Sequence, residues 1–365
     1  MKKFIIAITI IFLTFLSGCW DVHEIEDSIL PSSYGFSMSE GEEGFGKFKM
    51  YMEYISLQDE KSVYLITESS SVQEGLNNIS KRVDGNIRNA YLTALFLDEK
   101  IAKNGVSRYL NYFRRDPITA GTIVLAVSKT EMNELYESEV TKKRPLGDTL
   151  QHIITNNGPH SFQIPTQTLD EFYSKVRGEG IDPYLPYIRG GSEDFGTIGI
   201  VLFKNDKMVG KIDENLSQAL LISRHTARSG RISVNVEESD QIASFYSFIK
   251  SAHIIPKIEN GKVVTNINLR LQCYLTESPR VPNMLEDKEV IKKFERSINK
   301  DIKGQVERLF NILQNDYQVD PIGIGKIVKA RYPSYFRKVN WRKEFKRMEI
   351  KVDVRSNIRI ISTTT

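Results

Sequence analysis

The sequence is poor in the residues that build disulfide frameworks and metal centres. Its 365 residues include two cysteines, Cys19 and Cys273, and five scattered histidines. Two cysteines are too few for a disulfide-stabilised fold or for a zinc site made of paired cysteines. Stability is therefore expected to come from hydrophobic packing. Cys273 lies on the apolar side of an alternating segment, which predicts a buried, unreactive thiol.

The sequence also has few long apolar runs and a small net charge. One apolar run, from Phe4 to Leu16, follows Lys2 and Lys3, and no later run approaches the length of a membrane span. Removing the two lysines with this segment takes the 50 basic residues to 48, against 46 acidic residues, a net charge of +2. A balance so close to neutral identifies no class of partner.

The apolar run at the start of the chain is organised as a cleaved export signal, with a basic beginning and small residues at its end. As a helix it would be about 20 Å long, short of a hydrocarbon core of about 30 Å. Its last residues, Leu16-Ser17-Gly18-Cys19, resemble a bacterial lipobox, which implies cleavage before Cys19 and lipid on its thiol and new amino terminus. The alternative is a plain secretory signal with a chance cysteine.

Hydrophobic periodicity predicts a multidomain α+β fold with largely antiparallel sheets and packed helices, because the chain is long for one core. We predict a lipoprotein signal peptide over 1–18, a lipid-anchored polar tether over 19–33 and an N-terminal mixed α/β domain over 34–140. A middle domain over 141–228 and a C-terminal α+β domain over 229–365 follow. Within the N-terminal domain, the pattern favours one helix from Asp98 to Phe113.

The C-terminal region carries the clearest patterns. Asn260-Gly261 is a strong hairpin signal, and the apolar residues from Val263 to Leu275 keep one parity, which predicts a long strand with one polar face. An apolar stripe predicts a long helix over 287–315, and alternation from Met348 to Ile360 predicts a final strand. We expect an antiparallel sheet with the helix across its apolar face.

No spacing in the chain predicts catalysis. Gly323-Ile324-Gly325-Lys326 ends like a phosphate-binding loop, but Asp320 replaces the loop's first glycine and Ile327 replaces the hydroxyl that would hold magnesium. The histidines have no metal-ligand spacing, and no nucleophile motif is present. The sequence therefore predicts a protein that is not an enzyme and needs no cofactor or metal.

Basic residues gather near the C-terminal end of the chain, opposed in that interval by Glu344 alone. The cluster consists of Lys326, Lys329, Arg331, Arg337, Lys338, Arg342, Lys343, Lys346 and Arg347. We favour a solvated face, and the alternative is a surface that contacts anionic headgroups. Nucleic acid is excluded as a partner by the export signal. The candidate partner or membrane contacts are Arg337, Lys338, Trp341, Arg342, Lys343, Lys346 and Arg347.

Several segments, taken in order, resemble one family. The beginning Gly18-Cys19-Trp20-Asp21, with Glu24-Ile25, is similar to the start of the Ger(x)C spore germination lipoproteins, the C subunits of nutrient germinant receptors. The likeness continues through Phe96 to Gly105, Arg115-Asp116-Pro117, Gly196 to Gly210, Asp320 to Gly325, Tyr332-Pro333 and Trp341. Leu216 to Ala219 departs from the family pattern, which expects Glu-Thr before a small residue.

The resemblance implies a non-enzymatic protein of three mixed α/β domains on the outer face of the spore inner membrane. Its partners would be the integral membrane A and B subunits of the receptor, with the membrane itself reached through the lipid anchor. We favour a scaffold that docks these subunits and transmits the signal over a subunit that binds nutrient. A lipid-anchored solute-binding protein of a transporter is the alternative, disfavoured by the long one-sided strands. A lipid-anchored hydrolase lacks a nucleophile motif.

The last segments of the resemblance, Asp320 to Gly325 with Tyr332-Pro333 and Trp341, are called the C-terminal signature below. We expect a structural role for them. Pro321 suits the first turn of a helix, Pro333 disfavours helix at Tyr332 and so helps to end it, and Trp341 would pack just before the final strand. Partner contact is the alternative role.

Overall fold

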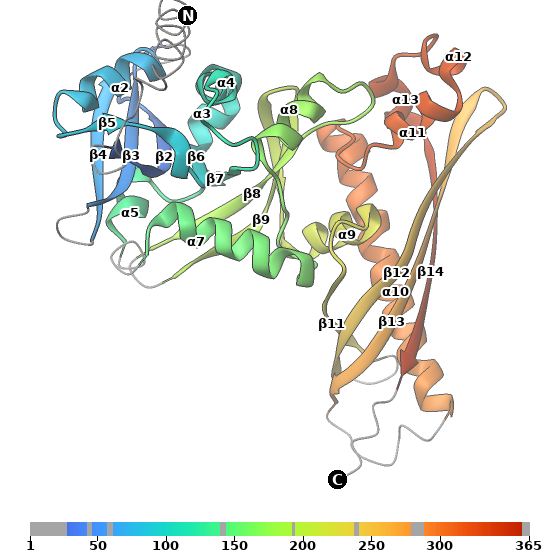
Figure 1. Cartoon of the computed structure of the whole chain (residues 1–365). Coiled ribbons are helices and arrows are strands. Elements are labelled where there is room, and N and C mark those ends of the chain that lie inside the picture. The colour runs from blue at the N-terminus through green and yellow to red at the C-terminus, as the bar shows by residue number, and fades with distance from the viewer. Residues whose placement is uncertain are drawn as a thin grey trace, which may run out of the picture.

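Two β-sheets stand side by side in the computed structural model, joined through helices that pack between them (Figure 1). The structure describes residues 28–41, 46–56, 61–138, 144–191, 194–236, 241–278 and 288–359. The predicted signal peptide and Cys19 lie outside these residues. Within the described ranges, no helix has the length and apolar character needed to cross a bilayer.

The first sheet has eight strands in the order β10-β9-β8-β7-β6-β2-β3-β4. Their bounds are β2 Pro31–Met38, β3 Phe48–Ser56, β4 Lys61–Ser69, β6 Ala94–Asp98, β7 Val124–Ser128, β8 Tyr184–Gly190, β9 Phe195–Lys204 and β10 Lys207–Ile212. The central pairs β2–β6, β6–β7 and β7–β8 are parallel, and the outer pairs are antiparallel. The sheet is mixed, so the predicted α+β class is confirmed, although parallel pairs are more frequent than expected.

Helices cover both faces of this sheet, as parallel central strands require. One face packs against α2 Val72–Ser80, α3 Glu99–Asn104, α4 Ser107–Arg115 and α8 Leu169–Arg177. The other packs against α5 Met132–Glu137 and α7 Leu146–His152, which continues through a π turn (Ile153–Asn157) and a 3-10 turn (Gly158–His160). Short strands β1 Ser28–Ile29 and β5 Asn86–Ile87 pair in parallel, and a 3-10 turn spans Asn89–Tyr91.

The prediction of a tether over 19–33 is wrong from Ser28 onward, because these residues form β1 and the start of β2. Ser32 and Ser33 are fully buried, and their hydroxyls donate to Oε2 of Glu53 at 2.9 and 2.8 Å. The buried Glu53 carboxylate also accepts from the backbone of Leu146 at 2.8 Å. Partners inside the fold satisfy these polar residues, so a segment with the composition of a linker is buried.

The helix predicted from Asp98 to Phe113 is divided at Gly105, where φ is +122° and α3 ends. Glycine adopts this conformation without the steric cost that a side chain would add. The sheet also continues across the boundary predicted between residues 140 and 141, because β8, β9 and β10 extend the sheet that begins with β2. Residues from the two predicted domains therefore share one sheet.

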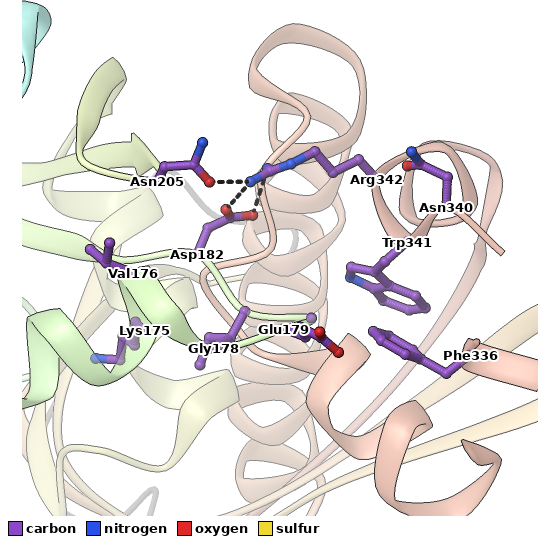
Figure 2. A pocket seen from close by; sticks show the side chains of 12 residues that line it. Lys175, Val176, Gly178, Glu179, Asp182, Asn205, Phe336, Asn340, Trp341 and Arg342 are labelled. Carbon is purple, nitrogen blue, oxygen red and sulfur yellow. Dashed lines mark hydrogen bonds and ion pairs between the residues drawn. The ribbon is translucent and has the colours of Figure 1, made fainter. Parts of the chain in front are cut away.

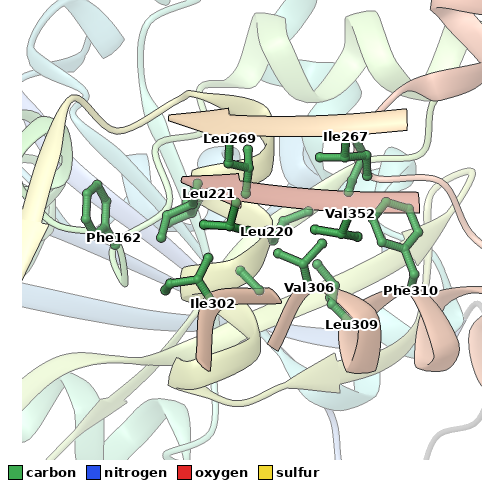
Figure 3. Close-up of a cluster of buried hydrophobic side chains, with 14 of the residues drawn as sticks. Phe162, Leu220, Leu221, Ile267, Leu269, Ile302, Val306, Leu309, Phe310 and Val352 are labelled. Atoms are coloured by element: carbon green, nitrogen blue, oxygen red, sulfur yellow. The ribbon is translucent and has the colours of Figure 1, made fainter. Parts of the chain in front are cut away.

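The second sheet has four strands in the order β11-β12-β13-β14: β11 Ser229–Asn235, β12 Ile242–Glu259, β13 Lys262–Glu277 and β14 Glu349–Arg359. The turn at Asn260-Gly261 joins the two longest strands, as predicted. Helix α10 Lys288–Ile312 lies along the sheet and continues as a π turn over Leu313–Tyr317. Figure 3 shows Ile302, Val306 and Leu309 of this helix packed toward β13 and β14. The fully buried Cys273 lies in this core, and burial raises the pKa of its thiol to about 11.

The final strand pairs with β13 in parallel, which differs from the antiparallel sheet expected. The chain between them contains α10 followed by three short helices, α11 Ile324–Arg331, α12 Pro333–Phe336 and α13 Trp341–Arg347. This crossover returns the chain to the end where β13 began, so β14 runs in the same direction. Alternation of apolar residues predicts a strand but carries no information about its direction.

Helix α9, Glu214–Arg224, connects the two sheets. Its Leu220 and Leu221 are buried in the core of the second sheet, although the helix directly follows the last strand of the first sheet. The second sheet itself begins at Ser229, where the C-terminal domain is predicted to begin. The two sheets are therefore packed together through shared helices.

Candidate functional site

The C-terminal signature lies where the two sheets meet. The loop between α8 and β8 runs beside the segment that precedes α11 and beside the first turn of that helix, and three hydrogen bonds join the loop to these residues. The amide of Asp182 donates to the carbonyl of Asp320 at 2.9 Å, and the amide of Asp320 donates to Oδ2 of Asp182 at 2.8 Å. The amide of Lys326 donates to the carbonyl of Gly180 at 2.9 Å. Signature residues therefore hold the first half of the chain directly.

Asp320 organises the start of α11. Its carboxylate is 1% exposed and accepts from the amide of Gly323 at 2.7 Å and that of Gly325 at 2.9 Å. Gly323 precedes the helix with φ of +85°, a conformation that favours glycine. Burial raises the pKa of Asp320 to about 6, and the backbone amides oppose that shift. The carboxylate thus takes up helix N–H groups that would otherwise have no partner.

Trp341 closes the same cluster. Its indole Nε1 donates to Oδ2 of Asp320 at 3.1 Å, and its ring stacks on Phe336 with centroids 5.8 Å apart. A Cβ placed on Gly325 would lie 2.4 Å from Cε2 of Trp341 and 2.6 Å from the Cα of Gly180. A side chain at position 325 would therefore push both the indole of Trp341 and the backbone of Gly180 away from α11. Figure 2 shows Trp341 and Phe336 side by side at this point.

An ion pair crosses the junction. Arg342 donates from Nη2 to Oδ1 of Asp182 at 2.7 Å and from Nη1 to Oδ2 at 3.0 Å, a bidentate arrangement visible in Figure 2. Arg342 also reaches the carbonyl of Gln318 and the side chain of Asn205 at 3.4 Å. Asp182 is 5% exposed, so its charge depends on this partner. We call Asp182, Asp320, Gly325, Trp341 and Arg342 the junction cluster.

A cavity of about 300 Å³ borders the junction cluster. Its walls come from the end of α8, the following loop, the turn between β9 and β10, and the segment from the end of α12 to the start of α13, including Lys175, Glu179, Asn205 and Asn340 (Figure 2). Both carboxylates of the cluster already accept hydrogen bonds from N–H donors of the chain. Across the described residues, no group of three or more His, Cys, Asp or Glu side chains is arranged to hold a metal ion. The chemistry of the junction cluster is that of a structural contact.

The structure separates the candidate contact residues into two groups. Trp341 and Arg342 belong to the junction cluster. Arg347 pairs with Glu344 at 2.5 Å, and that buried acid also accepts from the backbone of Val263 at 3.1 Å. Arg337 and Lys338 are exposed in the loop between α12 and α13, and Lys343 and Lys346 are exposed on α13; none of the four forms an ion pair inside the described ranges. Cys19, the predicted lipidation site, lies outside the described residues.

The expectations for the prolines have mixed outcomes. Pro333 begins α12 directly after Tyr332 ends α11, so its role in ending a helix is confirmed. Pro321 lies before α11 rather than in its first turn, so that prediction is wrong. The reason is the Asp320 cap, which starts the helix after Gly323. The carbonyl of Pro321 instead accepts from Nη1 of Arg224 at 2.5 Å.

Two other segments of the resemblance also meet in the structure. The amide of Val106 donates to the carbonyl of Asp206 at 3.0 Å, and that of Ser107 donates to Oδ2 of Asp206 at 3.3 Å. Gly105, which ends α3, lies against this aspartate, since a Cβ there would be 3.2 Å from its Oδ2. The turn between β9 and β10 is therefore bound to the start of α4.

Gly180 and Asp182 were missed by reasoning from the sequence. Gly180 accepts from the amide of Lys326, and Asp182 pairs with Asp320, which lies 138 residues further along the chain, so no local pattern could reveal these contacts. The spacing Asp-x-x-Gly-x-Gly from Asp320 to Gly325 was the available signal, because a short acidic side chain commonly caps a helix start.

Comparisons with known proteins agree over nearly the whole chain. Residues 21–190 match the family model described as "Spore germination protein N-terminal domain", and residues 198–361 match "Spore germination B3/ GerAC like, C-terminal". The chain is 22% identical to spore germination protein B3 of Bacillus subtilis (strain 168), over 95% of each chain. It is 22% identical to spore germination protein GerQC of Bacillus cereus, over 96% of each chain.

A solved structure shares the fold. The crystal structure of the GerBC protein superimposes with a TM-score of 0.60 at 18% sequence identity, covering 93% of this chain and 99% of that one. At this identity the likeness concerns the fold alone. Both sheets and the helices between them are included in the superposition, because the coverage is nearly complete on both sides.

Proposed function

Because this chain belongs to the Ger(x)C family of spore germination proteins, we propose that it is the lipid-anchored C subunit of a nutrient germinant receptor. In this role it is a non-catalytic scaffold and signalling component, required for nutrient-triggered germination. It works beside the integral membrane A and B subunits on the outer face of the spore inner membrane. Cys19 carries the lipid that holds it there.

The observation that carries the proposal is what the C-terminal signature does. Asp320 exchanges two hydrogen bonds with Asp182, and Gly325 lies against the backbone of Gly180, so both connect the C-terminal part of the chain to the first half. Trp341 supports this contact from within the C-terminal part by donating to the Asp320 carboxylate. A scaffold needs its parts held in a fixed arrangement, and the Asp182–Arg342 pair adds a second connection across the same junction. These contacts support a structural role for the family signature and leave partner contact to other surfaces.

The exposed cations on α13 and the loop between α12 and α13 are our candidate for such a surface. Arg337, Lys338, Lys343 and Lys346 are solvent-exposed, and β12 and β13 turn at the same end of the molecule (Figure 1). Each basic residue near an anionic membrane contributes about 1 kcal/mol to binding. We propose that these four residues contact either a receptor subunit or anionic headgroups.

Membrane fractionation of spores tests the anchor. The Cys19→Ala protein should lose its acyl groups, leave the membrane fraction and reduce germination, since a thiol is required for lipid attachment. Cys273→Ala is the matched control, because it removes the chain's other thiol from a buried strand position and should leave membrane association intact. A Cys19→Ala protein that stayed acylated and membrane-bound would contradict the proposal.

Charge reversal tests the contact surface. Lys343→Glu combined with Lys346→Glu should weaken co-purification with receptor subunits, or binding to anionic vesicles if the membrane is the partner. Lys204→Glu combined with Lys250→Glu reverses two exposed lysines on β9 and β12 and serves as the control. If both double variants behaved like the unmodified protein, the α12–α13 surface would be no contact site.

A further inference from the structure

A second, larger cavity lies beside the junction cluster, between α8 and α11. Its volume is about 890 Å³, and α8, β8, the end of α9 and α11 all contribute to its walls. Lys175 lines both this cavity and the smaller one in Figure 2. We call the larger space the Lys175 cavity. Its size falls within the range of about 300–1,000 Å³ that is usual for small-molecule sites.

Two cations flank one aromatic ring in the wall of this cavity. The ammonium of Lys175 lies 4.5 Å from the ring centroid of Tyr184, and the guanidinium carbon of Arg224 lies 5.5 Å from the same centroid. Lys175 is 9% exposed and donates to Oε1 of Gln167, a neutral acceptor. Nη1 of Arg224 donates to the carbonyls of Pro321 and Ile322 at 2.5 and 2.8 Å. Neither cation has a carboxylate partner among the described residues.

Two hydrogen-bond donors in the same wall have no partner within the described part of the chain. Tyr184 is fully buried and its hydroxyl forms no hydrogen bond, and Nε of Arg224 is buried and equally unpaired. Burial raises the pKa of Tyr184 and the charge of Arg224 opposes that shift, so the hydroxyl keeps its proton and remains a donor. Buried polar groups are nearly always hydrogen-bonded, so two unpaired donors next to two cations require an explanation.

Three acidic residues, Asp170, Glu171 and Glu179, also line this cavity. Glu171 accepts from the amide of Thr168 at 3.1 Å and from Nε2 of Gln167 at 3.0 Å. Glu179 pairs with Lys329 at 2.8 Å on the rim, and the carboxylate of Asp170 lies against Gly121. Lys326 of α11 also lines the cavity and adds positive charge. Four cationic side chains and three acidic ones therefore line the cavity, and the unpaired donors of Tyr184 and Arg224 lie in its wall.

We propose that the Lys175 cavity binds a small molecule through a carboxylate or phosphate group placed between Lys175, Arg224 and Tyr184. Charged N–H groups directed at an anionic oxygen form the strongest hydrogen bonds that proteins make, and the Tyr184 hydroxyl supplies a third donor. The remaining volume accommodates the body of the ligand beside the Tyr184 ring. This site is independent of the proposed function, because it rests on contacts inside the chain alone.

The protonation of Lys175 supports the proposal. Burial, together with the charges of Arg224 and Lys326, lowers the pKa of Lys175 to about 7, and Glu171 opposes that shift. A bound anion would stabilise the charged ammonium and raise this pKa again. Binding at about pH 8 should therefore take up a proton, which a surface lysine with an ordinary pKa of about 10.4 would not do.

Isothermal titration calorimetry on the full-length chain in mild detergent tests the site. The probes are sodium citrate and inorganic phosphate, with sodium chloride at matched ionic strength as the reference. We expect saturable binding of at least one probe with a Kd of about 1 mM or tighter. Preference for citrate identifies a carboxylate ligand, and preference for phosphate identifies a phosphorylated one. Absence of saturable binding by either probe to folded protein overturns the proposal.

Two variants assign the binding to this cavity. Lys175→Met keeps the length of the side chain and removes its charge, so it should weaken binding of the probe at least tenfold. It should also abolish the proton uptake on binding, which is measured by repeating the titration in buffers of different ionisation enthalpy. Lys204→Met, an exposed lysine on β9, should bind like the unmodified protein. Tyr184→Phe removes one donor without reshaping the wall and should weaken binding severalfold. Unchanged affinity in folded Lys175→Met protein would place the anion elsewhere and refute the site.

Discussion

The junction cluster and the Lys175 cavity are neighbours that treat buried polar groups in opposite ways. In the cluster, the Asp320 carboxylate accepts from two backbone amides and an indole, and Asp182 accepts from Arg342 and an amide. In the cavity, the Tyr184 hydroxyl and Nε of Arg224 have no partner in the described residues. Burial alone therefore does not reveal the role of a polar residue. Whether its donors and acceptors are used separates a structural contact from a candidate binding site.

The largest effect should follow from removing the indole of the junction cluster. Trp341→Ala deletes a ring that stacks on Phe336 and leaves one acceptor bond of Asp320 unmade. We expect a loss of about 3–5 kcal/mol in the free energy of unfolding, measured by denaturant titration. Phe248→Ala removes a 36% exposed ring from the second sheet and should cost much less. If Trp341→Ala kept full stability but abolished germination, the signature would be a docking surface instead.

Breaking the ion pair across the junction should have the next largest effect. Arg342→Met leaves the buried Asp182 carboxylate with the Asp320 amide as its remaining hydrogen-bond donor. Because Arg342 is itself about one-third exposed, we expect a moderate loss of about 1–3 kcal/mol in the free energy of unfolding. Lys343→Met changes the adjacent exposed cation and should stay within about 0.5 kcal/mol. Equal stability of the two variants would mean that the pair does not hold the junction.

The sequence predicted the parts of this fold that depend on local periodicity. Strand β13, helix α10 and the Asn260-Gly261 turn were all recognisable, because their patterns repeat within a few residues. The direction of β14 and the burial of Ser32 and Ser33 depend on distant partners and were predicted wrongly.

The junction was only half visible in the sequence for the same reason. Trp341 and Arg342 were identified as candidates, but Trp341 contacts Asp320, 21 residues away, and Arg342 contacts Asp182, 160 residues away, so neither contact follows from a local pattern. The Lys175 cavity gave no sequence signal, since Lys175, Tyr184 and Arg224 are spread over α8, β8 and α9 with ordinary spacing.

Replacing Lys175 should raise the free energy of unfolding, whereas the substitutions in the junction cluster should lower it. Lys175→Met removes an ammonium that folding must bury without a carboxylate, so we expect a gain of about 1–2 kcal/mol in the free energy of unfolding near pH 7. The loss of the hydrogen bond to Gln167 limits the gain. Urea titrations of the unmodified protein and of the Lys175→Met variant measure this difference in the free energy of unfolding. A loss of stability as large as that of Arg342→Met would show that Lys175 is a structural residue.

The pH dependence of that gain provides a further check. The pKa of Lys175 is about 7 in the folded chain, below the ordinary lysine value of 10.5, because of burial and the charges of Arg224 and Lys326, with Glu171 opposing. Between these two values the unfolded chain binds more protons than the folded one, so stability rises with pH across this window. The advantage of Lys175→Met should therefore be largest at or below pH 7 and shrink toward pH 10. A constant difference would contradict the lowered pKa.

The smallest effect compares two buried tyrosines. Tyr184 has an unpaired hydroxyl, whereas the hydroxyl of Tyr136 lies 3.1 Å from Oγ of Ser33, and both rings are almost fully buried. Removing a paired hydroxyl should cost about 1 kcal/mol, so Tyr136→Phe is expected to lower the free energy of unfolding. An unpaired hydroxyl loses its hydration on folding and gains no hydrogen bond in exchange. Tyr184→Phe should therefore leave the free energy of unfolding unchanged or raise it by up to about 1 kcal/mol. Parallel denaturant titrations measure both variants under identical conditions.

An equal loss of stability in the two variants would mean that the Tyr184 hydroxyl has a partner inside the folded chain, with Arg224 and Thr226 as the candidates. The contrast between the satisfied cluster and the unsatisfied cavity would then no longer hold, and neither would the third donor of the proposed anion site.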